Sequence, residues 1–281
     1  MKYQLLLFDL DDTLLRSDKT ISDFTMQALK ACREKGMRIG ISTSRSEQNS
    51  LVFIDELRPD IIISSGGALV KYNGTYIYEA GFTEEETIGM IQMARDICGT
   101  DCLITIDTVE KHYWNYKGEP KQYSSDPNQY KGWDSTIYTD FKEFTECALK
   151  MCVEIPDPAI AVKLQETLDD CDSVKFSDGD WYKFTKKSVT KESAILHMCG
   201  ICGITPEETI AFGDDYADIG MLKLCGKGIA MGNAVEAVKM AADEVIGDNN
   251  NDGIAHYLMN CSFIDNLFTI RYDKTEKQNL L

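Results

Sequence analysis

The chain has 281 residues, of which 43% are hydrophobic, so it is long and apolar enough for one large or two modest folded domains. Its formal net charge of −17 repels nucleic acids and anionic membranes, and we expect neither as a partner. Ten cysteines without regular spacing, a start unlike a signal peptide and the lack of a membrane-length apolar run indicate a cytoplasmic protein.

The first predicted element is an apolar strand that runs into carboxylates. Residues 5–8 have the composition of a central parallel strand, and its carboxyl end is at Asp9. Ligands gather outside the carboxyl ends of strands in open α/β sheets. Asp9 and Asp11 lie two residues apart, so in extended geometry their oxygens can share a divalent cation, for which Mg²⁺ is the obvious candidate. Considered alone, the cluster is explained equally well by a solvated Asp-rich turn.

Alternating helices and strands follow, and this alternation predicts a parallel sheet. Gly36 and Pro59 mark the ends of the two helices. The expected elements are, in order, a helix from Ser22 or Asp23 to about Lys35, a strand at 37–41, a helix at about 47–57, a strand at 61–63 and a hairpin that turns at Asn73-Gly74.

Residues 83–184 have a different pattern, in which helices alternate with antiparallel strands, and we expect an inserted α+β domain there. Its expected elements are a helix from the capping box at Thr83 to about Cys98, strands near 102–108 and 112–117, a helix near 140–150, a strand near 151–155, a helix at 158–170 and strands near 173–177 and 181–185 that meet at an Asp178-Gly179 turn.

From Thr190 the β-α-β pattern returns, so the parallel-sheet core is expected to be split around the insertion. The expected elements are a helix to Cys199 that stops at Gly203, a strand at 209–212, a helix to Cys225, a strand at 228–231, a helix through Ala242 and a fraying tail at 274–281. We therefore predict a core of residues 1–82 and 185–281 and an inserted domain of residues 83–184.

Three more positions carry groups that a phosphate would need. Thr43 follows the second strand, where its hydroxyl can bind phosphoryl oxygens or cap a helix. Lys191 opens a helix, where a cation is unfavourable unless an anion lies beside it, although a solvated surface lysine is the alternative. The segment Gly213-Asp214-Asp215-Tyr216-Ala217-Asp218 ends an apolar strand in carboxylates, as at Asp9, or caps the next helix.

Taken in this order, the motifs resemble those of the haloacid dehalogenase superfamily of aspartyl-phosphate phosphatases. The motifs are Asp9-x-Asp11-x-Thr13, Thr43, Lys191 and Gly213-Asp214-Asp215-x-x-Asp218. The stretches at 211–214, 228–234 and 252–255 look like the Cof-type branch with its type IIB cap. The resemblance implies an α/β fold with a Rossmann-like parallel-sheet core and an α+β cap. It also implies a Mg²⁺-dependent phosphatase, monomeric or homodimeric, acting on a small phosphorylated metabolite such as a sugar phosphate, nucleotide or phosphorylated cofactor.

The resemblance also implies a role for each matching residue. Asp9 would be the nucleophile that forms an aspartyl-phosphate, and Asp11 would be the general acid and base, with a pKa raised by Asp9 and Asp12. Thr43 and Lys191 would hold phosphoryl oxygens as charge redistributes. Further substrate contacts would be Ser44 and Arg45, and the metal ligands would be Asp9, Asp11 through its backbone carbonyl, Asp214 and Asp218.

Four positions depart from the family pattern and bear on rate and substrate class. Ser44 and Glu192 stand where a Gly is usual, and Glu192 would place a carboxylate near the Lys191 ammonium. Gly66 and Ala217 stand where an Asn is usual. The departures leave open a non-catalytic phosphosugar-binding sensor or a phosphomutase on the same scaffold.

Two further questions stay open at this point. A response-regulator receiver domain also combines acidic residues with Thr and Lys, but its phosphoacceptor lies on a later strand and it has no cap. The aromatic segment His112–Tyr116, with Tyr123, Tyr130 and Trp133, can stack on a sugar or heterocycle, or pack within the cap.

Overall fold

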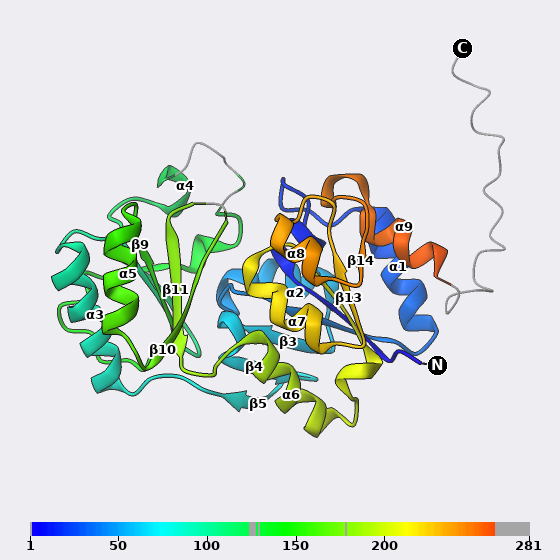
Figure 1. The fold of residues 1–281 in the computed structure, drawn as a ribbon, viewed down its shortest axis with the longest axis horizontal. Helices are drawn as coiled ribbons and strands as arrows, with labels where there is room; N and C mark the ends of the chain where they lie inside the picture. The colour runs from blue at the N-terminus through cyan, green and yellow to red at the C-terminus, as the bar shows by residue number, and fades with distance from the viewer. Residues whose placement is uncertain (1, 124–127, 129, 178, 262–281) are drawn as a thin grey trace, which may run out of the picture.

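The computed structural model describes residues 2–123, 128, 130–177 and 179–261, and these form two lobes, each built on its own sheet (Figure 1). The larger sheet has the strand order β14-β13-β12-β1-β2-β3-β4-β5. Strands β14 to β3 are parallel, and β4 and β5 are antiparallel additions. Its strands are β1 (Leu5–Phe8), β2 (Arg38–Ser42), β3 (Ile61–Ser64), β4 (Leu69–Tyr72), β5 (Thr75–Glu79), β12 (Thr209–Gly213), β13 (Lys227–Ala230) and β14 (Glu244–Val245).

Among the described residues the larger lobe has six α-helices. The predicted helix ends are confirmed where a capping residue marks them. Ser22 accepts a hydrogen bond from the backbone N–H of Thr25, and Gly203 ends α6 in a left-handed conformation. The Cys199-x-x-Cys202 pair therefore lies in the last turn of a helix, and both thiols are free. The helices are α1 (Asp23–Glu34), α2 (Leu51–Leu57), α6 (Lys191–Cys202), α7 (Ile219–Leu224), α8 (Glu236–Ala241) and α9 (Gly253–Asn260).

The smaller lobe, coloured cyan to green in Figure 1, has a second sheet with helices α3 and α5 on the side away from the larger lobe. The strand order is β10-β11-β9-β6-β7-β8, and all neighbours are antiparallel except β7 and β8. Its elements are α3 (Glu84–Cys98), β6 (Ile104–Asp107), β7 (His112–Trp114), α4 (Pro120–Tyr123), β8 (Ile137–Tyr138), β9 (Lys150–Glu154), α5 (Pro158–Thr167), β10 (Cys171–Lys175) and β11 (Trp181–Lys186).

Each lobe has its own hydrophobic core. The four side chains of β1 are fully buried at the centre of the larger sheet, where Phe8 stacks on Phe212 of β12 with ring centroids 4.6 Å apart. This confirms that an apolar run of four residues, too short for a helix, forms a central strand. The smaller core lies between its sheet and the helices α3 and α5.

The predicted helix near residues 140–150 is wrong. Phe141 has a φ of +54°, which a helix does not allow, and Lys150 already begins β9. Phe141 and Phe144 are spaced as on a helix, yet both rings pack into the smaller core from an irregular segment. Backbone N–H groups of this segment donate to the Thr87 hydroxyl and to the Asp107 carbonyl, so tertiary contacts replace helical hydrogen bonds.

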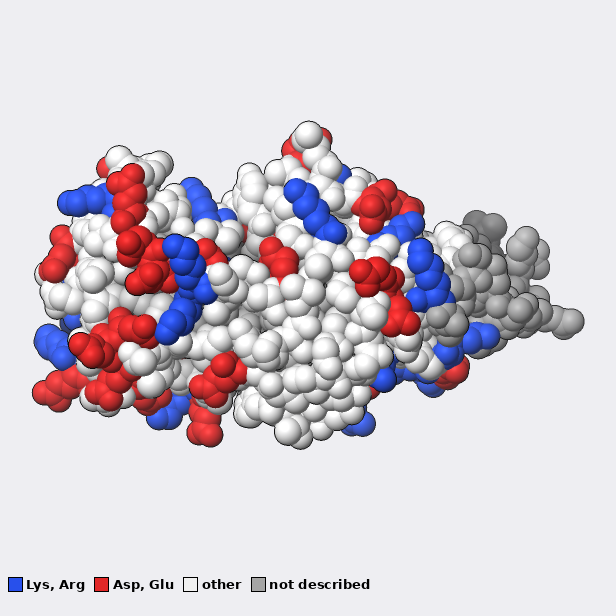
Figure 2. All heavy atoms as spheres, turned by 60° about the horizontal axis from the view of Figure 1, so that its bottom comes forward, with Lys and Arg blue, Asp and Glu red and all other residues white. Residues whose placement is uncertain are grey.

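Two expectations lie outside the described residues, namely the Asp178 turn position and the tail at 274–281. In the described part of the chain, every helix is too short or too polar to cross a bilayer. Figure 2 shows acidic and basic side chains interspersed on the smaller lobe and a broad area with few charged residues on the larger lobe, so this face offers no continuous basic surface.

Candidate active site

The parallel register of the larger sheet brings three predicted residues to one edge. Phe8 is aligned with Phe212 of β12 on one side and Ile41 of β2 on the other. Asp9, Thr43 and Asp214 follow these three strands, so all three stand at the carboxyl edge of the sheet.

Lys191 reaches the same edge because the loop after β3 packs tightly against the start of α6. Gly67 in that loop has a φ of +108°, and a Cβ there would lie only 2.1 Å from the carbonyl oxygen of Thr190. Thr190 in turn caps α6 through its hydroxyl, which accepts from the backbone N–H of Ser193. Glycine is therefore required at position 67, and the start of α6 is held against the loop.

The buried ammonium of Lys191 lies between two carboxylates. Its Nζ is 2.7 Å from Oδ1 of Asp9 and 2.6 Å from Oδ1 of Asp218. Burial alone would lower the pKa of Lys191, but Asp218 and Asp9 outweigh it and raise that pKa above its usual value. A cation at a helix N-terminus is thus stabilised by adjacent anions.

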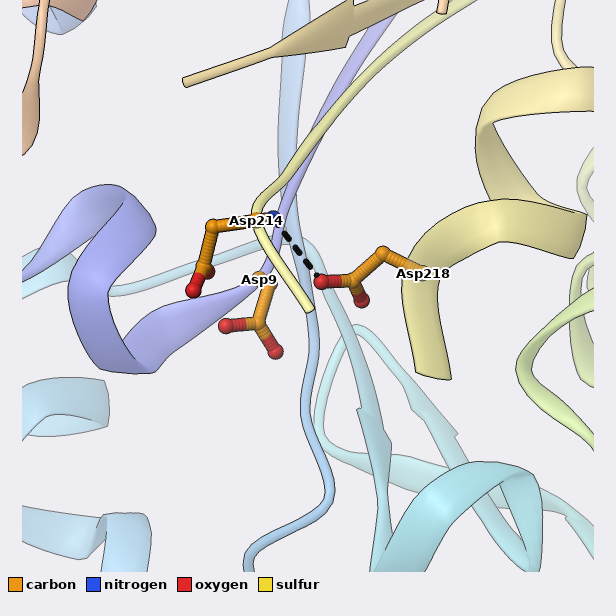
Figure 3. A group of neighbouring side chains, drawn as sticks. All are labelled: Asp9, Asp214 and Asp218. Atoms are coloured by element: carbon orange, nitrogen blue, oxygen red, sulfur yellow. Dashed lines mark hydrogen bonds between the residues drawn. The ribbon is translucent and has the colours of Figure 1, made fainter. Parts of the chain in front are cut away.

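Three carboxylates converge beside this lysine (Figure 3). Oxygens of Asp9, Asp214 and Asp218 lie within 4.8 Å of one another. Asp218 Oδ2 accepts from the backbone N–H groups of Asp214 at 3.0 Å and Asp215 at 3.1 Å, and the Thr13 hydroxyl donates to Asp214 Oδ1 at 2.5 Å. With the bond from Lys191 to Asp9, hydrogen bonds therefore orient all three acids.

These acids have the chemistry of a site for a hard divalent cation. Burial raises the pKa of Asp214, and Asp9 and Asp218 raise it further. Burial likewise raises the pKa of Asp9, only partly offset by Lys191. A bound Mg²⁺ would relieve this repulsion, because it prefers carboxylate oxygens and favours their ionised form. The carboxylate oxygens of these three aspartates are thus suitable ligands for Mg²⁺.

Asp11 is not part of this group of three and is held by two cations. Arg45 donates two hydrogen bonds to its carboxylate, at 2.6 Å and 2.8 Å, and Lys19 Nζ lies 2.8 Å from it. Burial would raise the pKa of Asp11, but Arg45 and Lys19 hold it well below its usual range. The prediction of a raised pKa from Asp9 and Asp12 is therefore wrong, since it left out both cations.

The segment after β2 links the site to the smaller lobe. The buried Thr43 hydroxyl accepts from the backbone N–H of Arg45 at 3.1 Å. The Ser44 carbonyl accepts from Lys150 Nζ at 2.5 Å, and Arg45 Nη1 donates to the Lys131 carbonyl at 2.8 Å. Ser44 and Arg45 are thus tied to the smaller lobe through the Ser44 backbone and the Arg45 guanidinium.

A cavity of about 200 Å³ lies between the lobes and includes the predicted residues. Its floor carries Asp9, Asp11, Thr43, Lys191 and Asp214, and its opposite wall is largely aromatic. The aromatic residues of that wall are His112, Trp114, Tyr130, Trp133, Phe176 and Trp181. Several pack edge to face, including Trp114 on Trp133 at 5.7 Å and Tyr130 on Trp133 at 5.0 Å.

Comparison with known proteins agrees with this arrangement. The haloacid dehalogenase-like hydrolases match residues 6–258 of the chain. The chain belongs to this family. A sugar phosphatase of HAD subclass IIB, BT4131, has a similar structure, with a TM-score of 0.79 at 26% identity over 91% of this chain and 98% of its own. Two Bacillus subtilis (strain 168) proteins are also similar in sequence. They are the 5-amino-6-(5-phospho-D-ribitylamino)uracil phosphatases YitU, 24% identical over 92% of this chain and 97% of its own, and YcsE, 28% identical over 90% and 93%.

Membership in the haloacid dehalogenase-like hydrolases confirms several predictions. The Cof-type resemblance and the α/β core with an α+β cap are both confirmed. So is the enzyme class, a hydrolase of phosphoric monoesters, because the similar proteins are phosphatases. The smaller lobe is accordingly called the cap below.

The departures from the haloacid dehalogenase pattern have structural counterparts. Gly66 has a φ of +71°, and a Cβ there would lie 2.9 Å from Nζ of Lys183, so a cap lysine fills the space beside it. Glu192 lies against Gly220, because a Cβ built on Gly220 would be only 1.5 Å from Oε1 of Glu192. The preceding residue, Lys191, forms its ion pairs with two aspartates instead. Ala217 is part of the cavity wall.

Sequence reasoning named His112 as a stacking residue but missed the buried polar cluster that it forms between cap and core. Asp107 accepts hydrogen bonds from His112, Ser65 and Lys150. Ser65 and Lys150 lie far in sequence from the neighbouring Asp107 and His112, so no local motif marks the whole cluster. A charged lysine at the start of an apolar strand, as in Lys150-Met151-Cys152-Val153, was the one available signal.

Proposed function

We propose that the chain is a Mg²⁺-dependent phosphatase that hydrolyses small phosphorylated metabolites through an aspartyl-phosphate on Asp9. The observation that carries the proposal is the Lys191 ammonium held between Asp9 and Asp218 at the floor of a cavity that the cap covers. Such a floor combines a nucleophile, a cation for the phosphoryl oxygens and carboxylates for a metal. Membership in the haloacid dehalogenase-like hydrolases supports the same chemistry.

Asp9 and Lys191 would act together in the first step. A carboxylate oxygen of Asp9 attacks phosphorus, the bond to the leaving oxygen breaks, and an aspartyl-phosphate forms. Lys191 Nζ and the Thr43 hydroxyl would hold the phosphoryl oxygens. Mg²⁺, held by Asp9, Asp214 and Asp218 with support from the Asp11 backbone carbonyl, would offset the charge of the phosphate when bound.

Asp11 would carry the proton in both steps. It gives a proton to the leaving oxygen and later takes one from the water that hydrolyses the aspartyl-phosphate. The Arg45 and Lys19 pairs keep it ionised before substrate binds. A phosphate dianion competes for the Arg45 guanidinium, and an Asp11 released from it would be left near Asp9, whose charge favours protonation.

The cap would select the leaving group. We propose that residues 1–82 and 185–281 form the catalytic core and that residues 83–184 form the specificity domain. The aromatic cavity wall suits a sugar or a heterocycle, in keeping with the sugar and ribitylaminouracil phosphatases among the similar proteins. We also propose a monomer or homodimer in the reducing cytoplasm that binds neither nucleic acid nor membrane, consistent with ten free cysteines and a net charge of −17.

A phosphosugar-binding sensor is the second candidate, favoured by the two cations that occupy Asp11 and by the four departures. A phosphomutase would return the phosphoryl group to a second hydroxyl of the sugar instead of to water. Measuring phosphate release distinguishes the sensor and the phosphomutase from a phosphatase, because neither of them releases inorganic phosphate in proportion to the substrate consumed.

Phosphate release from a metabolite panel and from p-nitrophenyl phosphate, with and without Mg²⁺, tests the proposal. We expect Mg²⁺-dependent turnover by the wild type and loss of turnover in Asp9→Asn, with mass spectrometry to check for deamidation of the Asn. Asp23→Asn, an exposed acid of α1, is the matched control and should retain activity. Folded wild type that releases no phosphate from any compound would exclude the phosphatase, and full activity in Asp9→Asn would exclude the nucleophile.

A further inference from the structure

His112 and Asp107 form a buried pair in the cap wall of the cavity. Asp107 ends β6 and His112 begins β7, with exposed fractions of 0% and 2%. His112 lines the same cavity as Asp9 and Asp11, on the opposite side. His112 therefore borders the space where the leaving group of a phosphate ester would lie, and Asp107 lies behind it.

The contacts of Asp107 decide which nitrogen of His112 carries the hydrogen. Asp107 Oδ1 lies 2.6 Å from His112 Nδ1, while Oδ2 accepts from the Ser65 hydroxyl at 2.9 Å and from Lys150 Nζ at 2.9 Å. A carboxylate surrounded by donors only accepts, so Nδ1 carries the hydrogen that points to it. Burial lowers the pKa of His112, which keeps the ring neutral and leaves a lone pair on Nε2.

His112 Nε2 is a buried acceptor with no hydrogen-bond partner among the described residues. Buried polar atoms in proteins nearly always have a partner, and an exception marks a place for one that is absent. The surroundings of this acceptor are aromatic. The Trp133 ring stands edge to face with the imidazole at 4.8 Å and 74°, and Trp114, Tyr130 and Trp181 continue the wall.

We propose that His112 Nε2 accepts a hydrogen bond from a hydroxyl or ring N–H of the leaving group, and so selects phosphate esters whose ring carries such a donor. The inference rests on the proposed phosphatase function and adds a substrate class to it. His112 is the specificity-determining residue, and Asp107 positions it. Ser65 belongs to the core whereas Asp107 and His112 belong to the cap, so the pair is fully held only with the cap against the core.

Hydroxyphenyl phosphates with the hydroxyl at position 2, 3 or 4, each paired with its methoxy analogue, test the proposal. Each pair differs only in the donor hydrogen and a methyl group. We expect the wild type with Mg²⁺ to prefer at least one hydroxyl compound by about tenfold or more in kcat/KM, since a site built to bond a donor rejects analogues that lack it. His112→Phe should abolish this preference, and His112→Gln should keep part of it because its amide oxygen can accept.

The outcomes separate this inference from the function on which it rests. A wild type without preference at any position, or a preference that survives in His112→Phe, overturns the role of His112 while phosphate release still supports a phosphatase. Absence of phosphate release from all six compounds counts against the phosphatase instead.

A binding measurement tests the role of His112 even if none of the six compounds releases phosphate, or if His112→Phe does not fold. The ¹⁵N resonance of His112 Nε2 in the Asp9→Asn protein should shift on addition of one hydroxyl compound and not of its methoxy partner. The chain has only three histidines, so the resonance can be assigned. Equal shifts with both members of every pair, or none, overturn the inference.

Discussion

Replacing Lys183 by Met should stabilise the protein, because this buried cap lysine forms no ion pair with any of the described residues. Its side chain is 4% exposed on β11 and lies over Gly66. Burial, together with the neighbouring cations Lys191 and Lys150, lowers the pKa of Lys183 from 10.5 to about 8. Methionine has a similar unbranched stem without the charge, so it can fill the same space.

The stability gained in Lys183→Met can be calculated from the lowered pKa of Lys183. A change from 10.5 to about 8 corresponds to about 3 kcal/mol at 1.36 kcal/mol for each pKa unit, and we take this as an upper limit for the gain at pH 7. Below pH 8 the lysine is protonated in both states and the full penalty is present. Between pH 8 and 10.5 the unfolded state binds more protons, so wild-type stability rises with pH and the advantage of Lys183→Met shrinks.

Urea unfolding of the wild type and Lys183→Met at pH 7 and pH 10 measures this gain. We expect about 1–3 kcal/mol at pH 7 and much less at pH 10. Lys163→Met, which removes an exposed lysine of α5, is the control and should change stability by less than about 0.5 kcal/mol. A loss of stability in Lys183→Met, or a gain of equal size at both pH values, would refute the reasoning.

Two further predictions concern the packing and the metal ligands. Gly67→Ala should cost about 3 kcal/mol or more and displace Lys191, because its Cβ would meet the Thr190 carbonyl at 2.1 Å. Gly89→Ala in α3, with nothing within 4 Å, should instead raise the melting temperature slightly, and equal effects in the two variants would contradict the packing argument. Saturating Mg²⁺ should stabilise the wild type by about 2.7 kcal/mol at a hundredfold excess over Kd, and clearly less in Asp214→Asn. An equal thermal shift in both proteins would remove Asp214 from the metal site.

The core could be predicted because its signals are local in sequence. The buried run of β1, the cap at Ser22 and the glycine stop at Gly203 each fall within a few residues. The carboxyl ends of neighbouring parallel strands lie at the same edge of a sheet. The order of the strands and motifs in the sequence therefore predicts that Asp9, Thr43 and Asp214 lie together, as the register confirms.

The electrostatics of the site could not be predicted in the same way. The pKa of Asp11 depends on Arg45 and Lys19, whose side chains reach it from a different strand end and from the following loop. The neighbours in sequence, Asp9 and Asp12, are anions that would raise the pKa of Asp11, whereas the two cations lower it. The false helix at 140–150 has the same origin, since Phe141 and Phe144 have helical spacing but pack from an irregular segment.

Hydrogen bonds join the core to the cap. Lys150 donates to the Ser44 carbonyl, Arg45 donates to the Lys131 carbonyl, and Ser65 donates to Asp107. A typical hydrogen bond contributes about 0.5–1.5 kcal/mol net, because water replaces the lost partner, so each of these three contacts contributes on that scale to holding the cap against the core. Under the proposed function, a phosphate that takes Arg45 from Asp11 would also change one of the groups that hold the cap against the core. Arg45 would thus link phosphate binding and release of the Asp11 carboxylate to the contact between core and cap.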